Sequence, residues 1–210
     1  MRAQRRFAAG LLAALAAGWL CAGCAPGPGS APQLEARLWK RARPPVELVA
    51  GDLVAAGDEL YLTVIPRRTL YVYLLNRDAR GERQILYPCR GWGRSRPLAG
   101  RLRHRLPPPL LGRETFWPVR AATADEHLLV LACARPAATL DEAVQAAAGT
   151  PPCAAPLGSD AGRWLEGLSL VDLSASGGPR GPHASSWRAQ PSGEEGWLLD
   201  FNLVGAADHG

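Results

Sequence analysis

The cysteine and histidine side chains are the residues of this sequence best suited to nucleophilic, redox or metal chemistry. The four histidines have no spacing typical of metal ligands, and His209 lies next to the C-terminus. Cys89 with His104 or His127 would offer a thiol and an imidazole, but chance supplies such pairs in a chain with several of each. Neither a serine-nucleophile turn, nor a zinc-binding helix motif, nor a phosphate-binding loop occurs. We therefore expect no catalytic residue, no metal site and no cofactor.

The strongest polar feature is the stretch from Arg90 to Arg120, which holds eight arginines and a single acid, Glu114. Guanidinium groups bind carboxylates and phosphates through paired hydrogen bonds, so this stretch is a candidate surface for an anionic group or an acidic partner. The candidate binding residues are Arg90, Trp92, Arg94, Arg96 and Arg101. A simpler interpretation, which we favour, is a solvated loop followed by an exposed strand face. Arginine alternates with leucine or histidine over residues 101–106, as such a strand face requires.

Three cysteines, Cys89, Cys133 and Cys153, lie in the main part of the chain. An oxidising compartment permits one disulfide among them and leaves the third thiol free or paired between chains. Cys133–Cys153 is the candidate bridge, since it would join a strand to the loop after a helix. A Cys89–Cys133 bridge and no bridge at all stay open as alternatives.

The N-terminal segment has the composition of an export signal. Three arginines within the first six residues precede an uncharged apolar run over residues 7–20, which is too short to span a membrane as a helix. The run leads into Cys-Ala-Gly-Cys, with two small residues before Cys24. This arrangement resembles a bacterial lipoprotein signal, which implies cleavage before Cys24 and a diacylglycerol and palmitate anchor there. An ordinary secretory signal and an uncleaved anchor stay open as alternatives.

The composition predicts one β-rich domain. A chain of 210 residues is long enough for one hydrophobic core, and its 23 glycines and 19 prolines favour short strands over long helices. The net charge of +5 falls to +2 when the signal is removed, so we expect no nucleic-acid partner. We divide the chain into a signal peptide (1–23), a Pro/Gly-rich tether (24–45), a β-rich domain (46–149) and a loop-rich C-terminal extension with two strands packed on that domain (150–210).

Alternation of apolar and polar residues predicts the strands. Tyr71 and Tyr73 fall on one strand face, where they would line a ligand surface or pack under a second layer. The expected strands cover residues 59–65, 69–75, 84–87, 102–106, 115–119, 127–133, 168–173 and 197–204. One short helix is expected to begin at a capping box of Thr139 and Glu142, and residues 174–193 are expected to be a flexible loop. The fold class is mainly β: a small antiparallel β-sandwich-like domain with one or two short helices.

The central strands carry an ordered series of motifs: Asp58–Leu62, Leu70–Asn76, Asp78–Gly81 and Ile85–Pro88. The series resembles the bacterial "domain of unknown function 4384" family, with its strand, its tyrosine-rich hairpin and a second strand that ends in an aromatic residue and proline. The resemblance covers about residues 46–145. It implies a small β-rich accessory domain of envelope or secretion-linked proteins, and it implies no reaction.

Two classes of function are compatible with these features, and enzyme activity is not expected. The first is an envelope-anchored accessory module that binds another envelope protein, in a secretion or signalling assembly. The alternative is a binding protein for an anionic envelope glycolipid or glycan. The expected partners are the membrane, through the lipid on Cys24, and a second envelope protein. Ala25, rather than aspartate, after the lipidated cysteine favours the outer membrane, with the domain facing the periplasm.

Overall fold

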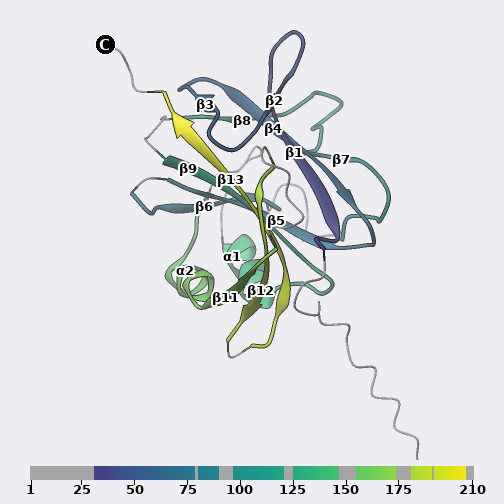
Figure 1. Ribbon diagram of the computed structural model, residues 1–210, viewed down its shortest axis with the longest axis vertical. Coiled ribbons are helices and arrows are strands. Elements are labelled where there is room, and N and C mark those ends of the chain that lie inside the picture. The colour runs from purple at the N-terminus through teal and green to yellow at the C-terminus, as the bar shows by residue number, and fades with distance from the viewer. Residues whose placement is uncertain are drawn as a thin grey trace, which may run out of the picture.

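The chain forms two β-sheets and two short helices, stacked in three layers (Figure 1). A computed structural model describes residues 31–78, 80–89, 97–120, 125–146, 155–173, 181–190 and 192–206. Within these residues, a five-stranded sheet packs on one face of an eight-stranded sheet, and both helices cover the other face of the larger sheet. The predicted fold class is confirmed: a mainly β, antiparallel, sandwich-like domain with two short helices.

The five-stranded sheet is formed by strands from the first half of the chain. Its order is β2 (Val46–Leu48), β1 (Leu34–Lys40), β4 (Glu59–Pro66) and β7 (His104–Leu106), with β8 (Trp117–Pro118) also paired with β4. Side chains alternate across a strand, so β1 buries Leu34, Ala36 and Leu38 and turns its other residues away from the core. The face of this sheet directed away from the larger sheet is called the outer face below.

The eight-stranded sheet combines strands from both halves of the chain. Its order is β10 (Ala155–Pro156), β6 (Arg83–Tyr87), β5 (Tyr71–Arg77), β9 (Asp125–Cys133), β13 (Glu195–Gly205), β12 (His183–Ala189) and β11 (Leu168–Asp172). The short strand β3 (Leu53–Val54) runs parallel to the end of β13. All the other pairings described are antiparallel.

Two hydrophobic cores hold the layers together. The core between the sheets contains Leu38, Leu62 and Val130. The core between the larger sheet and the helices contains Tyr73 of β5 and Leu140 of α1 (Ala138–Ala146), and α2 (Ser159–Glu166) adds its buried alanine. Strands β5 and β9 are buried on both faces, which explains their nearly continuous apolar sequences. Tyr73 is fully buried, so it packs under a second layer, one of the two alternatives for this strand face.

The predicted domain boundaries are wrong at two places. Residues 34–40, assigned to the tether, form β1, because leucine and alanine at every second position face the core, while the charged Glu35 and Arg37 between them are exposed. Residues 155–206, assigned to an extension, contribute strands to the middle of the larger sheet, where β13 pairs with both β9 and β12. The expected flexible loop over 174–193 contains β12, whose Trp187 is buried in the helix-side core.

The predicted start of the helix is also wrong, because the helix begins at Ala138 and Thr139 lies inside it. Side chains that are distant in sequence accept hydrogen bonds from the first N–H groups of the helix, in place of the expected capping box. The Ala137 N–H donates to the Tyr73 hydroxyl at 3.0 Å, and the Ala138 N–H donates to Glu194 Oε1 at 2.8 Å. Unpaired N–H groups at a helix start need acceptors, and tertiary contacts supply them here.

The candidate bridge Cys133–Cys153 is wrong, since Cys133 is a free thiol. Its side chain points into the helix-side core and donates to the Arg135 carbonyl oxygen. Burial raises the pKa of Cys133 to about 12. Cys89, two residues after β6, is disulfide-bonded, and the free Cys133 is not its partner. The alternative bridge Cys89–Cys133 is therefore wrong as well.

Several N-terminal predictions lie outside the described residues: the signal peptide over residues 1–23 and the lipidation site Cys24. In the part of the chain that is described, no helix has the length and apolar character needed to cross a membrane.

Candidate functional site

The structure places the predicted arginine surface differently from the sequence analysis. Arg90, Trp92, Arg94 and Arg96 lie outside the described residues. Arg101 sits in an exposed turn with a φ of 64°, and its N–H donates to the Pro66 carbonyl oxygen at 2.6 Å. Two later arginines of the same stretch, Arg103 and Arg105, reach the outer face of the five-stranded sheet, where each lines a cleft.

Strand register assembles the outer face. Trp39 of β1 is directly opposite Tyr61 of β4, and Thr63 of β4 is directly opposite Arg105 of β7. Directly opposed residues on neighbouring strands project from the same face of a sheet. Because Leu38, Leu62 and Leu106 face the inner core, their neighbours in sequence project outward and meet there.

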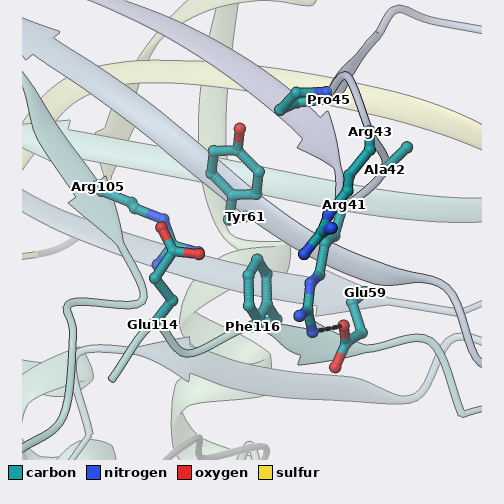
Figure 2. Close-up of a pocket in the computed structure, with 9 residues that line it drawn as sticks. All are labelled: Arg41, Ala42, Arg43, Pro45, Glu59, Tyr61, Arg105, Glu114 and Phe116. Carbon is teal, nitrogen blue, oxygen red and sulfur yellow. Dashed lines mark hydrogen bonds and ion pairs between the residues drawn. The ribbon is translucent and has the colours of Figure 1, made fainter. Parts of the chain in front are cut away.

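A cleft of about 570 Å³ lies on this face. It is lined by Arg41, Ala42, Arg43, Pro45, Glu59, Tyr61, Arg105, Glu114 and Phe116. Figure 2 shows Tyr61 and Phe116 in the middle, with Arg105 and Glu114 on one side and Arg41 and Arg43 on the other. The cleft therefore combines aromatic rings with charged groups of both signs, which is a composition suited to binding a polar ligand or a protein segment.

A cluster of aromatic rings and guanidinium groups lies at the cleft. Trp39 and Tyr61 lie nearly parallel, with ring centres 6.2 Å apart, and Tyr61 meets Phe116 edge to face. The guanidinium carbon of Arg105 lies 4.5 Å from the Tyr61 ring centre and 4.6 Å from that of Phe116. The guanidinium carbon of Arg41 lies 4.7 Å from the Phe116 ring centre. Each cation–aromatic contact stabilises its partners by about 0.5–1 kcal/mol at an exposed site, so the cluster holds both arginines in place.

Hydrogen bonds fix one half of the Arg105 guanidinium group and leave the other half unused. Arg105 Nη1 donates to the carbonyl oxygens of Pro107 and Thr115, at 2.9 and 2.8 Å. Arg105 Nη2 is buried, and among the described residues it has no hydrogen-bond partner. Burial lowers the pKa of Arg105, while the nearby Glu114 carboxylate raises it. A buried donor without a partner costs free energy.

The other charges of the cleft are only partly paired. Arg41 Nη1 forms an ion pair with Glu59 Oε2 at 2.5 Å. Arg43 is exposed and, within the described part of the chain, makes no ion pair. The lining holds three arginines and two glutamates, so it carries a net charge of +1.

A second cleft of about 210 Å³ lies beside the first on the same face. It is lined by Glu35, Arg37, Trp39, Thr63, Ile65 and Arg103. The Trp39 Nε1–H donates to Thr63 Oγ1 at 3.0 Å, which fixes the indole ring between the two clefts. The outer face thus carries two neighbouring clefts, with Trp39 lining the smaller one and lying against Tyr61 of the larger one.

Elsewhere, the described residues include no group of three or more histidine, cysteine, aspartate or glutamate side chains arranged to hold a metal ion. The described residues also include two imidazole–carboxylate pairs, of which His183–Asp172 is exposed. In the other pair, His127 Nδ1 lies 3.0 Å from both carboxylate oxygens of Asp200. These residues belong to the adjacent strands β9 and β13 of the larger sheet, away from the outer face.

The sequence analysis missed most of the cleft. Arg41 and Arg43 lay in the segment taken for a tether, and Tyr61 and Phe116 were considered only as strand residues. Alternation of apolar Leu34, Ala36 and Leu38 with other residues was the available sequence signal for β1, and it places Trp39 and Arg41 on the face of that strand opposite the three apolar residues.

The chain matches no protein-family model, no curated protein and no solved structure. Its function is therefore argued from the geometry of the cleft and from the sequence.

Proposed function

We propose that this protein is an envelope-anchored, non-catalytic accessory module that binds another envelope protein through the outer face of its five-stranded sheet. The observation that carries the proposal is the cluster of aromatic rings and guanidinium groups beside an open cleft, formed by Trp39, Tyr61, Arg105, Phe116 and Arg41. Tryptophan, tyrosine and arginine are the residues most enriched at energetically important positions of protein–protein interfaces.

The layer order supports the use of this face. The larger sheet is covered on one side by the smaller sheet and on the other by α1 and α2, whereas the outer face of the smaller sheet carries no described layer. The outer face also holds its aromatic and guanidinium groups rigidly, so a partner would order few side chains on binding. Such preorganisation lowers the entropic cost of association.

The anchor is proposed from the sequence. A lipid on Cys24 and the residues that follow it would hold the domain at the membrane, and Ala25 favours the outer membrane with the domain in the periplasm. A role in a secretion or signalling assembly follows from the resemblance of the β5–β6 hairpin to the family of unknown function named above. Replacing Cys24 with alanine tests the anchor, because incorporation of labelled palmitate should then be lost; undiminished labelling would contradict it.

Site-specific photo-cross-linking in intact cells tests the docking proposal. Ala42 is exposed and lines the cleft, while Ala146 is exposed at the end of α1 on the opposite side of the molecule. A photoreactive residue at position 42 should capture a reproducible protein partner, and the same residue at position 146 should not. Capture of a glycolipid or glycan from position 42, or the same protein from both positions, would contradict the proposal.

A further inference from the structure

Strand β11 forms one edge of the eight-stranded sheet, and among the described residues it pairs only with β12. We propose that this edge is a dimerisation surface, along which β11 of one chain pairs antiparallel with β11 of a second copy. The larger sheets of the two chains would then form one continuous sheet across a two-fold axis. No residue of β11 lines either cleft of the outer face, so the inference is independent of the proposed docking function.

β11 is the longest of the strands that have a single neighbour in the described part of the chain. It has five residues, whereas β2, β3, β7, β8 and β10 have two or three. Prolines also restrict two of these short edges, since Pro45 precedes β2 and Pro156 ends β10. Short strands, prolines and charges are the usual protection against pairing with another chain. Residues 168–171 of β11 include no proline and no charged residue.

The ladder between β11 and β12 directs the backbone groups of Leu170 outward. Opposed residues in an antiparallel ladder alternate between hydrogen-bonded and non-hydrogen-bonded pairs. The Leu173 N–H donates to the Ala184 carbonyl oxygen at 2.8 Å, so these two residues form a hydrogen-bonded pair. Val171 and Ser169 are therefore the next residues that bond to β12. The N–H and carbonyl groups of Leu170 point away from β12, as a donor and an acceptor for an added strand.

The side chains of β11 favour a strand as the occupant over a partner docked on one face. Leu170 is directly opposite Trp187, which is buried in the helix-side core, so Leu170 projects to that face and Val171 to the other. Their exposed fractions are 53% and 48%. A partner on one face of the sheet would cover only one of these side chains. A strand added at the edge would flank both and would bond to the Leu170 backbone.

β11 is itself complementary to this edge. With the two-fold axis at Leu170, the two Leu170 residues are opposite each other and Ser169 is opposite Val171 of the second copy. The single charged residue, Asp172, is opposite Leu168 of the second copy, so the two carboxylates stay apart. Apolar cross-strand pairs stabilise a sheet, whereas like charges directly opposite each other destabilise it. Self-complementary two-fold interfaces are also the commonest kind in oligomers.

Disulfide cross-linking of the full-length chain in intact cells tests the dimer and its register. Leu170→Cys should give a disulfide-linked species of twice the chain mass, because the Cα atoms of a hydrogen-bonded pair lie about 5.5 Å apart, within disulfide range. Ser169→Cys alone should give none, whereas Ser169→Cys and Val171→Cys chains expressed together should cross-link. Leu102→Cys is the control: Leu102 has a similar exposed fraction, 58%, and should give no linked species.

Sedimentation of the purified full chain in detergent micelles measures the affinity. The unmodified chain should dimerise with rising concentration, and Leu170→Lys should weaken the dimer at least tenfold, because lysine at a strand edge opposes pairing. Leu102→Lys should leave the affinity unchanged.

Four results would overturn the inference. A monomer at every concentration would exclude the dimer, and equal affinities of Leu170→Lys and the unmodified chain would exclude this edge. Cross-linking by Ser169→Cys alone that equals cross-linking by the mixed chains would exclude the register. A Leu170→Cys cross-link to a different protein, in place of a second copy, would make the edge a site for a strand of that protein.

Discussion

The guanidinium carbon of Arg105 lies 4.5 Å from the centre of the Tyr61 ring, across the junction between β7 and β4. The Phe116 ring centre is 4.6 Å from the same carbon, so the arginine contacts both rings, which themselves meet edge to face. This contact makes a charged side chain part of the packing of the outer face. Arg105 also lines the cleft, which links the stability of the sheet to its proposed binding surface.

Replacing Arg105 with lysine should separate charge from planarity. Lysine keeps the positive charge but loses the flat stacking surface and the paired donors to Pro107 and Thr115. We expect the free energy of unfolding to fall by about 1–2 kcal/mol, measured by urea denaturation. The matched change Arg135→Lys, at an exposed position, should alter it by less than about 0.5 kcal/mol. If Arg105→Lys and Arg135→Lys are equally stable, the contacts of the Arg105 guanidinium group contribute nothing to the free energy of unfolding.

The Tyr73 hydroxyl group should matter more than that of Tyr61. It accepts from the Ala137 N–H at 3.0 Å and donates to Asp141 Oδ1 at 2.8 Å, so it joins β5 to the start of α1. Tyr73→Phe leaves a buried N–H group without this acceptor and should lower the free energy of unfolding by about 1–3 kcal/mol. Tyr61→Phe, whose hydroxyl faces the open cleft (Figure 2), should cost less than about 0.5 kcal/mol. If Tyr61→Phe lowers stability more than Tyr73→Phe in thermal or urea unfolding, the Tyr73 hydroxyl group does not stabilise the start of α1.

Gly196 should tolerate no side chain. A Cβ atom at this position of β13 would lie 2.0 Å from the Ala132 carbonyl oxygen of β9, which is backbone and cannot move aside without breaking the ladder. Gly196→Ala should therefore destabilise the fold by at least about 2 kcal/mol, measured by thermal unfolding. Gly162→Ala in α2 is the control: its Cβ would meet an ordinary contact at 3.7 Å, and alanine in a helix should stabilise by about 0.5–1 kcal/mol.

The cysteines should differ in reactivity. With Cys133 buried and its pKa raised to about 12, native protein at pH 8 should resist alkylation there, and unfolding without reductant should expose this thiol. Cys89 should react only after reduction. We expect Cys153 to be its partner, because Cys153 comes two residues before Ala155, which pairs with Ile85 of β6. Peptide mass mapping reads all three sites, and a Cys133-containing bridge would contradict the assignment.

The raised pKa of Cys133 also determines whether the protein gains or loses stability at alkaline pH. The folded state holds the Cys133 proton more tightly than the unfolded chain, whose thiol has the ordinary pKa of 9.0. Stability should therefore fall as the pH rises above 9, by at most about 1.4 kcal/mol per pH unit from this group. Cys133→Ala should show a shallower decline in urea unfolding between pH 8 and pH 10, and an identical decline would exclude a contribution from this thiol.

Alternating apolar residues and the residues of one turn predicted several strands and one hairpin from the sequence. The strands now seen as β4, β6 and β9 were expected from alternation, and the β5–β6 hairpin from the turn ending at Gly81, which has a φ of 78°. Strand β12 was missed because it begins after a Gly- and Pro-rich segment and buries two serines, Ser185 and Ser186. Composition therefore indicated a loop where pairing with β13 makes a strand.

The cleft could not be derived from the sequence because it depends on register between distant segments. Arg41 follows β1, Tyr61 lies on β4 and Arg105 on β7, and only the pairings of Trp39 with Tyr61 and of Thr63 with Arg105 bring them to one face. The cap of α1 by Glu194 also depends on tertiary contacts. Glu194 lies on the β12–β13 hairpin, so the sequence of the helix itself does not predict this acceptor. Local sequence identified the arginine-rich stretch, whereas tertiary pairing selected which of its arginines reach the cleft.

The central claim is that the outer face binds another envelope protein, and its most direct test is the affinity of the partner captured from position 42. Binding of that purified partner should weaken at least tenfold for Arg43→Glu and should weaken further as salt concentration rises. Arg135→Glu, which makes the same charge change on the opposite side of the molecule, should bind like the unmodified protein. Equal losses for the two variants, or no loss for Arg43→Glu, would contradict the account.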